Sequence, residues 1–193
     1  MKASLYIALL HYPIQNRNGE TVPTAVTNLD LHDISRTGRT YGAKAYYVVT
    51  PVEDQHGIVA RILTYWKTES SKKYHPDRFE ALSIVSLQRN FGEVLADITE
   101  REGGVRPEVV LTDARQRPNS VTYKDFREEL WSPKREKPVL LVFGTGWGLA
   151  EEFYSHADRV LYPVFGPNGA SGDYNHLSVR AAAGIILDRL FGR

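Results

Sequence analysis

Short apolar runs rich in β-branched residues recur along the chain, and they alternate with stretches whose apolar positions repeat every three or four residues. Several of these runs are apolar at every position, as strands are when helices cover both faces of a sheet. The alternation is typical of an α/β protein with a largely parallel sheet. It predicts six strands, at Ser4 to Leu10, Ala45 to Thr50, Ala81 to Leu87, Glu108 to Leu111, Pro138 to Phe143 and Arg159 to Leu161.

The stretches between the predicted strands carry the apolar stripes of helices packed on a sheet. The polar stretch Ser70 to Asp77 and the Pro/Gly-rich stretch Pro163 to Tyr174 are expected to be the longest loops. No internal repeat or linker interrupts the pattern, so residues 1–193 are expected to form a single domain. The predicted helices are Asp54 to Glu69, Phe91 to Glu102, Tyr123 to Trp131, Gly148 to His156 and Leu177 to Leu190, with one more in the middle of 28–43.

Composition narrows the classes of function. The chain has no cysteine, which excludes disulfides, thiolate catalysis and cysteine-bound metals, and a reducing cytoplasm is the expected location. The six histidines lack the spacing of a metal site, and no run approaches the ~18 apolar residues of a membrane helix. With 24 Lys and Arg against 23 Asp and Glu, a nucleic-acid surface would have to be a local patch.

Three alternating glycines, Gly144, Gly146 and Gly148, follow a strongly apolar predicted strand. Such a segment either makes a tight turn or lets a ligand approach the main chain beside free N–H groups. The glycine spacing departs from the dinucleotide fingerprint, which disfavours a nicotinamide site. A nucleotide-binding α/β enzyme that holds a phosphate here is an alternative, although the Walker lysine and the following Ser or Thr are missing.

Two further segments could carry chemistry. The glycine- and proline-rich stretch from Tyr162 feeds the terminal helix through Asn175-His176-Leu177, and it fits either a ligand site or a surface loop. In the segment 28–43, Arg36 and Arg39 fall on neighbouring positions of one helix face. Asp33 lies one turn before Arg36, and a solvated ion pair is the simpler interpretation of that spacing.

Taken in order, the three segments resemble the signature of the SPOUT methyltransferases, which modify RNA with S-adenosylmethionine (SAM). The resemblance covers nearly the whole chain. It lies in Asp30 through Arg36-Thr37 to Tyr41-Gly42, in Gly144 to Leu149, and in Asn175 to Gly184 with the loop from Pro163. The chain most resembles a small stand-alone bacterial group that is sometimes fused to the tRNA guanine-N1 methyltransferase. The terminal helix of that group also opens Asn-His-Leu-Ser-Val-Arg.

The resemblance implies a mostly parallel six-stranded sheet with helices on both faces and a C-terminal trefoil knot at about 138–190, a rare exception to unthreaded topology. It also implies a homodimer, in which the knot of one subunit and the arginine of the first motif from the other form the site. SAM would be held mainly by backbone groups in the knot. The implied cofactor contacts are Phe143, Gly144, Thr145, Gly146, Gly148, Leu161, Tyr162, Val164, Gly166, His176 and Leu177.

The resemblance also suggests catalytic residues for methyl transfer to tRNA or rRNA. In relatives that methylate ribose, an arginine at the position of Arg36 is thought to bind the RNA backbone and help activate the 2′-hydroxyl. Where those relatives have Asn, Ser and Asn, this chain has Asp30, Tyr174 and His176, so Asp30 and His176 join Arg36 as candidates.

The acceptor atom is left open by these departures. The ribose 2′-oxygen is favoured, but a base nitrogen is an alternative because Asp30, Asp33 and Asp173 could all lie near the site. A further alternative is a protein that binds SAM or RNA on the same scaffold without transferring a methyl group.

One local concentration of cations could bind RNA. The stretch from Arg61 to Arg78 places lysines among aromatic residues, a combination that suits backbone contact and base stacking. The simpler interpretation is preferred here: Tyr65 and Trp66 finish the core face of a helix, and the lysines are only solvated. The other residues concerned are Lys67, Lys72, Lys73, Tyr74 and His75.

Overall fold

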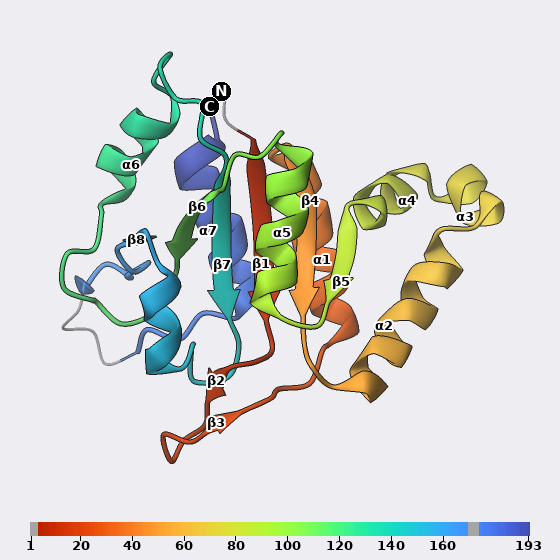
Figure 1. Ribbon diagram of the computed structural model, residues 1–193, viewed down its shortest axis with the longest axis horizontal. Coiled ribbons are helices and arrows are strands. Elements are labelled where there is room, and N and C mark those ends of the chain that lie inside the picture. The colour runs from red at the N-terminus through yellow and green to blue at the C-terminus, as the bar shows by residue number, and fades with distance from the viewer. Residues whose placement is uncertain (1–3, 170–173) are drawn as a thin grey trace.

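Six parallel strands form the centre of the molecule in the order β5-β4-β1-β7-β6-β8, which confirms the predicted sheet (Figure 1). The computed structural model describes residues 4–169 and 174–193. No helix within those residues is long and apolar enough to cross a membrane. The strands are β1 (Leu5–Leu10), β4 (Ala43–Val49), β5 (Val85–Gln88), β6 (Glu108–Leu111), β7 (Val139–Gly144) and β8 (Arg159–Val160).

Side chains of the sheet pack into two hydrophobic cores, one on each face. Along β1, Leu5, Ile7 and Leu9 face one core, while the residues between them face the other, and all are fully buried. This continuous burial follows from helices on both faces of a parallel sheet. One face is covered by α1 (Asn28–Thr40), α6 (Tyr123–Leu130) and α7 (Val179–Phe191), and the other by α5 (Phe91–Arg101) and the 3₁₀ helix η1 (Glu151–His156) (Figure 1).

Side-chain caps fix where several helices begin. The hydroxyl of Thr27 accepts from the N–H of Asp30 at the start of α1, and Ser178 caps α7 in the same way. The side chains of Asn90 and Thr122 cap α5 and α6 in the same way. Each cap satisfies an N–H that has no partner inside its helix. Because the cap of α7 is Ser178, this helix begins at Val179, two residues later than the predicted start at Leu177.

The connection between β4 and β5 differs from the prediction. Besides α2 (Glu53–Trp66), it contains α3 (Glu69–Tyr74) and α4 (Pro76–Ser83), so the loop predicted at Ser70 to Asp77 is wrong. The strand predicted at Ala81 to Leu87 is wrong in its first half, because Ala81 and Leu82 are buried helical positions of α4. A short apolar run fits a helix end or a strand equally well, and Pro76 in the first turn starts the helix.

The glycine-rich region near residue 146 also differs. The helix predicted at Gly148 to His156 is reduced to η1. Gly148 has a φ of +100°, which no right-handed helix accommodates, and the next two residues pair with Ile14 and Pro13 instead. The small hairpin of β2 (Ile14–Gln15) and β3 (Thr21–Val22) was not predicted. Two-residue strands are too short to leave a hydrophobic pattern.

Candidate functional site

Because the strands are parallel, their carboxyl ends lie along one edge of the sheet, where ligands bind in open α/β sheets. The glycine turn after β7, the loop after β8 and the start of α1 all belong to this edge. The β2–β3 hairpin extends from the same edge (Figure 1). Segments that are far apart in the sequence are therefore brought together here.

The glycines of the turn are required by the protein's own packing. A Cβ on Gly144 would lie 3.0 Å from the backbone nitrogen of Leu149, where the turn folds back on itself. A Cβ on Gly146 would lie 3.1 Å from Cγ2 of Ile14 in the hairpin, and its φ of +56° is also unfavourable for other residues. The tight-turn interpretation is correct for these two positions, and contacts of this turn with SAM stay a prediction.

A chain of polar contacts ties this turn to the N-terminal part of the protein. The hydroxyls of Thr145 and Thr24 lie 2.5 Å apart, and Thr145 also donates to the carbonyl of Leu10. Nδ1 of His11 lies 3.1 Å from the hydroxyl of Thr24. The imidazole of His11 is fully buried, and burial lowers its pKa to about 4, although the carboxylate of Asp30 opposes this. His11 is therefore neutral near pH 7.

Asp30 sits in a buried ion pair between the two helices that border the site. Its carboxylate accepts from the hydroxyl of Thr27 at 2.6 Å and from Nη1 of Arg180 at 2.9 Å. The same guanidinium contacts Asp33 at 3.3 Å, so Asp33 pairs with Arg180 rather than with Arg36. The side chain of Asp30 is 6% exposed. Asp30 thus joins the start of α1 to the first turn of α7.

The other two catalytic candidates lie on the surface. Arg36 is exposed on α1, beside a shallow hollow that Asp33, Thr37 and Tyr41 also line. Its guanidinium has no hydrogen-bond or ion-pair partner among the described residues. Its Cα lies nine residues beyond the cap Thr27, about 13 Å along the helix axis.

Three residues beside the terminal helix were also named from the sequence. His176 is exposed, with its ring centroid 6.4 Å from that of Tyr174. Asp173 lies outside the described residues. The structure therefore brings neither His176 nor Arg36 into the buried cluster around Asp30.

The loop after β8 offers main-chain donors. The N–H of Leu161 donates to Leu111, and that of Tyr162 donates to Val121. Beyond this point, the N–H groups of Val164, Phe165 and Gly166 donate to no backbone carbonyl within residues 4–169 and 174–193. No atom of the described residues would lie within 4 Å of a Cβ on Gly166. Of the other predicted contacts, Phe143 and Leu161 are buried, while Leu177 is 42% exposed.

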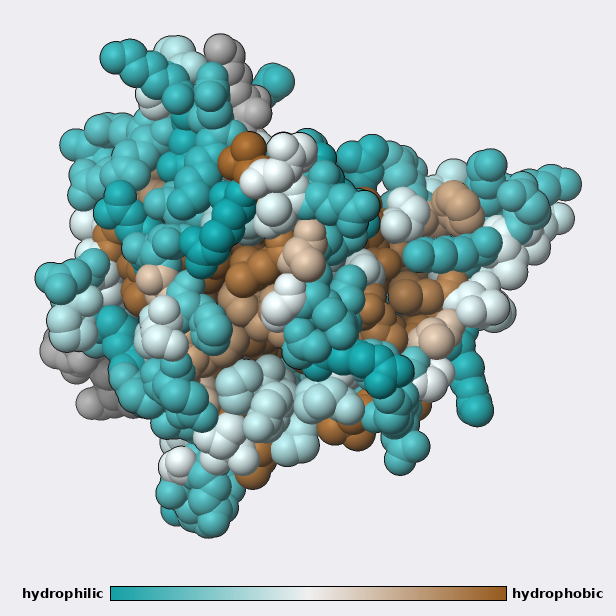
Figure 2. Space-filling model, viewed as in Figure 1, coloured by the Kyte–Doolittle hydropathy of each residue, from teal (hydrophilic) through white to brown (hydrophobic). Residues whose placement is uncertain are grey.

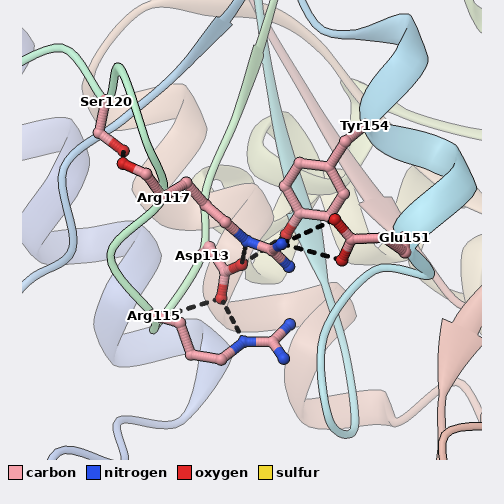
Figure 3. A network of polar contacts seen from close by, with 6 residues as sticks. All are labelled: Asp113, Arg115, Arg117, Ser120, Glu151 and Tyr154. Carbon is pink, nitrogen blue, oxygen red and sulfur yellow. Dashed lines mark hydrogen bonds and ion pairs between the residues drawn. The ribbon is translucent and has the colours of Figure 1, made fainter.

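A second polar network holds the loop between β6 and α6 against η1 (Figure 3). Arg117 donates to Asp113 at 2.7 Å and to Glu151, and its guanidinium lies 4.2 Å from the ring centre of Tyr154. Burial opposes the charge of Asp113, but hydrogen bonds from Tyr154, the Arg115 backbone and Arg117 outweigh it and lower the pKa. The guanidinium of Arg115 is 3.6 Å from where a Cβ on Gly148 would lie, so this loop borders the glycine turn.

No sequence pattern indicated a role for five residues of these networks, namely His11, Thr24, Arg180, Asp113 and Arg117. Arg180 lies in a segment that carries the resemblance, but no pattern pairs it with a residue 150 positions away. The spacing of Asp113 and Arg117 would signal a pair one helical turn apart, yet they lie outside any helix. These contacts depend on tertiary structure.

We expect His11 to destabilise the protein in acid. Its pKa is lower in the folded state than the ordinary 6.5, so the unfolded chain takes up the proton first as the pH falls. The free energy of unfolding should fall by about 3 kcal/mol between pH 6.5 and pH 4. Urea unfolding across this range would measure the loss. His11→Gln should flatten the profile.

We also expect Arg180→Ala to destabilise the protein by about 2–3 kcal/mol, because it leaves the buried carboxylate of Asp30 unpaired. Arg39→Ala is the matched control, since the pair of Arg39 with Glu80 is exposed and should contribute less than about 1 kcal/mol. Asp30→Asn in the Arg180→Ala background should recover part of the loss in urea unfolding. Equal costs for the two arginine variants would contradict this role.

Comparisons with known proteins agree with this architecture. A family model for a SAM-dependent RNA methyltransferase matches residues 4–192. A protein of Aquifex aeolicus is 44% identical over 98% of this chain and 89% of its own length. A tRNA (guanine-N(1)-)-methyltransferase of Nitratidesulfovibrio vulgaris is 43% identical over 98% of this chain, which spans 42% of that relative.

Solved structures show the same fold at low sequence identity. The SpoU methyltransferase AviRb from Streptomyces viridochromogenes, in complex with AdoMet, aligns with a TM-score of 0.56 and 17% identity over 99% of this chain and 58% of its own. The TrmH/SpoU tRNA modifying enzyme of A. aeolicus gives 0.55 and 18%, over 98% and 74%. The parallel sheet, the glycine turn at its carboxyl edge and the match over residues 4–192 lead to one conclusion: this chain belongs to the SAM-dependent RNA methyltransferases and has the SPOUT fold.

Proposed function

We propose that this chain transfers the methyl group of SAM to a ribose 2′-oxygen of a tRNA and works as a homodimer. The observation that carries the proposal is the meeting of the glycine turn, the loop after β8 and the α1–α7 ion pair at one sheet edge. The names of two relatives, both tRNA methyltransferases, support tRNA as the substrate. An rRNA substrate is the alternative.

The residues at this edge fit a cofactor held by main-chain groups. Val164, Phe165 and Gly166 offer N–H donors, and the space beside Gly166 is open among the described residues. The side chain of Leu177, 11 residues after Gly166, is exposed and offers an apolar contact to a ligand. SAM, when bound, supplies an electrophilic methyl group on a sulfonium. The chain has to bind it, exclude water and align the acceptor.

The pairing of β8 supports the trefoil knot expected at about 138–190. Leu161 donates to Leu111 at the end of β6, while Val121 donates to Val160 and accepts from Tyr162 on the other side. The segment of residues 159–162 thus lies between the two ends of the loop that runs from Leu111 to Val121. A segment enclosed in this way is what a threaded C-terminus requires.

The position of Arg36 supports a site shared by two subunits. Its guanidinium is exposed and unpaired among the described residues, and it lies about 13 Å along α1 from the edge that carries the loops of its own chain. An arginine placed there suits a phosphate on RNA bound at the site of a second copy. Beside a ribose, its charge would favour loss of the 2′-hydroxyl proton to solvent water as the oxygen accepts the methyl group.

The state of Asp30 supports ribose over a base nitrogen. A carboxylate that takes a proton from a base must be free to accept it. In this chain the carboxylate of Asp30 already accepts from Thr27 and Arg180 and is nearly inaccessible. Asp33 is more exposed, so a base-nitrogen acceptor is kept as the alternative. Mass spectrometry of nucleosides from treated tRNA would separate a 2′-O-methyl product from a methylated base.

We expect Arg36→Ala to leave the Kd for SAM within about twofold and to reduce methyl transfer to tRNA by about 100-fold or more. Transfer of a radioactive methyl group to unfractionated bacterial tRNA would measure activity, and calorimetry would measure SAM binding. Arg39→Ala is the control, because Arg39 lies one turn away on the same helix and pairs with Glu80. Loss of SAM binding in Arg36→Ala would assign the residue a structural role instead.

We expect Gly166→Val to weaken SAM binding at least tenfold without changing the midpoint of unfolding, since a Cβ there would meet no other atom of the described residues within 4 Å. Gly57→Val is the control, at another glycine in open surroundings. Mixing Gly166→Val with Arg36→Ala chains then tests the shared site. Random exchange of subunits in a C₂ dimer should restore roughly a quarter of wild-type activity. No restoration by exchanged dimers would mean that each chain uses its own Arg36.

A further inference from the structure

The three helices between β4 and β5 extend away from the sheet. Parallel neighbouring strands need one crossover helix, but this connection has α2, α3 and α4. In Figure 1, α2 and α3 lie beyond the β5 edge, on the side of the molecule opposite α6. Only Val59 is fully buried among the 14 residues of α2. Residues 53–83, here called the arm, therefore do more than cover the sheet.

The aromatic residues of the arm have different roles. Trp66 anchors the arm, because its ring packs edge-on against His32 of α1 at 5.4 Å and lies under the guanidinium of Arg78 at 4.7 Å. Tyr65 and Tyr74 are 67% and 68% exposed. The expectation that both Tyr65 and Trp66 finish the core face is correct for Trp66 and wrong for Tyr65. Two aromatic rings on the arm thus face solvent.

Unpaired positive charge gathers at the outer end of the arm. The segment from Lys67 to Tyr74 holds three lysines and one glutamate, on a chain whose net charge is +1. At the base of the arm, Glu53 and Glu80 pair with Arg89 and Arg39. The lysines Lys67, Lys72 and Lys73 form no ion pair among the described residues.

One of these lysines also lies beside an exposed ring. The ammonium of Lys73 lies 5.4 Å from the ring centre of Tyr74. Figure 2 shows apolar side chains gathered where the arm joins the body, and a mostly hydrophilic surface at the outer end. The outer end therefore suits a polar, negatively charged partner better than an apolar one.

We propose that the outer end of the arm binds the RNA substrate through Lys67, Lys72 and Lys73, with Tyr65 and Tyr74 stacking on unpaired bases. Lysines neutralise phosphates, and exposed aromatic rings stack on bases that are not paired, which together bind single-stranded or looped RNA. The proposal rests on the proposed function and adds a second contact region to it. Since α2 is about 20 Å long and begins at the site edge, the bound RNA extends well beyond the methylated nucleotide.

The test compares two triple variants that each remove three lysines. Lys67→Ala/Lys72→Ala/Lys73→Ala changes the arm, and Lys124→Ala/Lys134→Ala/Lys137→Ala removes the same charge from exposed positions in and after α6. Binding of unfractionated bacterial tRNA and of a 20-nucleotide oligouridine would be measured at several salt concentrations. SAM binding and methyl transfer to the tRNA would be measured in parallel.

We expect the arm variant to bind both RNAs at least tenfold more weakly. The negative slope of log K, the association constant, against log salt concentration should become less steep by about 2, as the loss of three phosphate contacts predicts. The SAM affinity of the arm variant should be unchanged, and the α6 variant should bind RNA within twofold of wild type. Tyr65→Ala/Tyr74→Ala should weaken binding at least fivefold with little change in the salt slope.

Two results would overturn the proposal, and they are distinguishable. If the wild-type protein methylates tRNA and the arm variants match the α6 variant in RNA binding, the arm is not an RNA surface and the proposed function stands. If the wild-type protein binds SAM but neither binds nor methylates tRNA, the proposed function fails and the arm proposal fails with it.

Discussion

β1 and β7 are hydrogen-bonded on both edges and buried on both faces, so neither strand can shift relative to the sheet without exposing apolar side chains on two sides. Their parallel register fixes the carboxyl ends of all the central strands along one edge. Residues as distant as His11, Thr145 and Leu161 reach the site only because of this register. The loops at this edge can therefore be irregular, since the strands beneath them fix their ends.

The ion pair of Asp30 with Arg180 performs a similar task for the helices. It joins α1 to α7 at the edge where the loops lie. The carboxylate of Asp30 contacts both Thr27, which caps α1, and Arg180 in the first turn of α7. A buried pair of this kind adds little net stability, but the loss of either partner is costly. Asp30 is therefore tied into the framework, while Arg36 and His176 are exposed.

The sheet and the family could be predicted because they depend on local patterns. Runs buried on both faces, such as Leu140 to Phe143, have no polar position that would allow another interpretation. Prediction failed at Ala81 and Leu82, where a helix end and a strand look alike, and at the hairpin, whose strands are only two residues long. The resemblance named the loops of the candidate site, and their contacts with SAM stay a prediction. The ion pairs of the site could not be predicted, because Arg180 and Asp30 come together only through the fold.

Two segments of the candidate site, the glycine turn at Gly144 to Gly148 and the stretch Val164 to Gly166, differ in how firmly the rest of the chain holds them. The glycine turn is held by Ile14 of the hairpin and by the hydroxyls of Thr24 and Thr145, so its conformation is set by the N-terminal part of the chain. The stretch from Val164 to Gly166 lacks such backbone partners among the described residues. A ligand bound between them would order mainly the second segment, so the entropic cost of binding would fall on one short loop while the glycine turn is already preorganised.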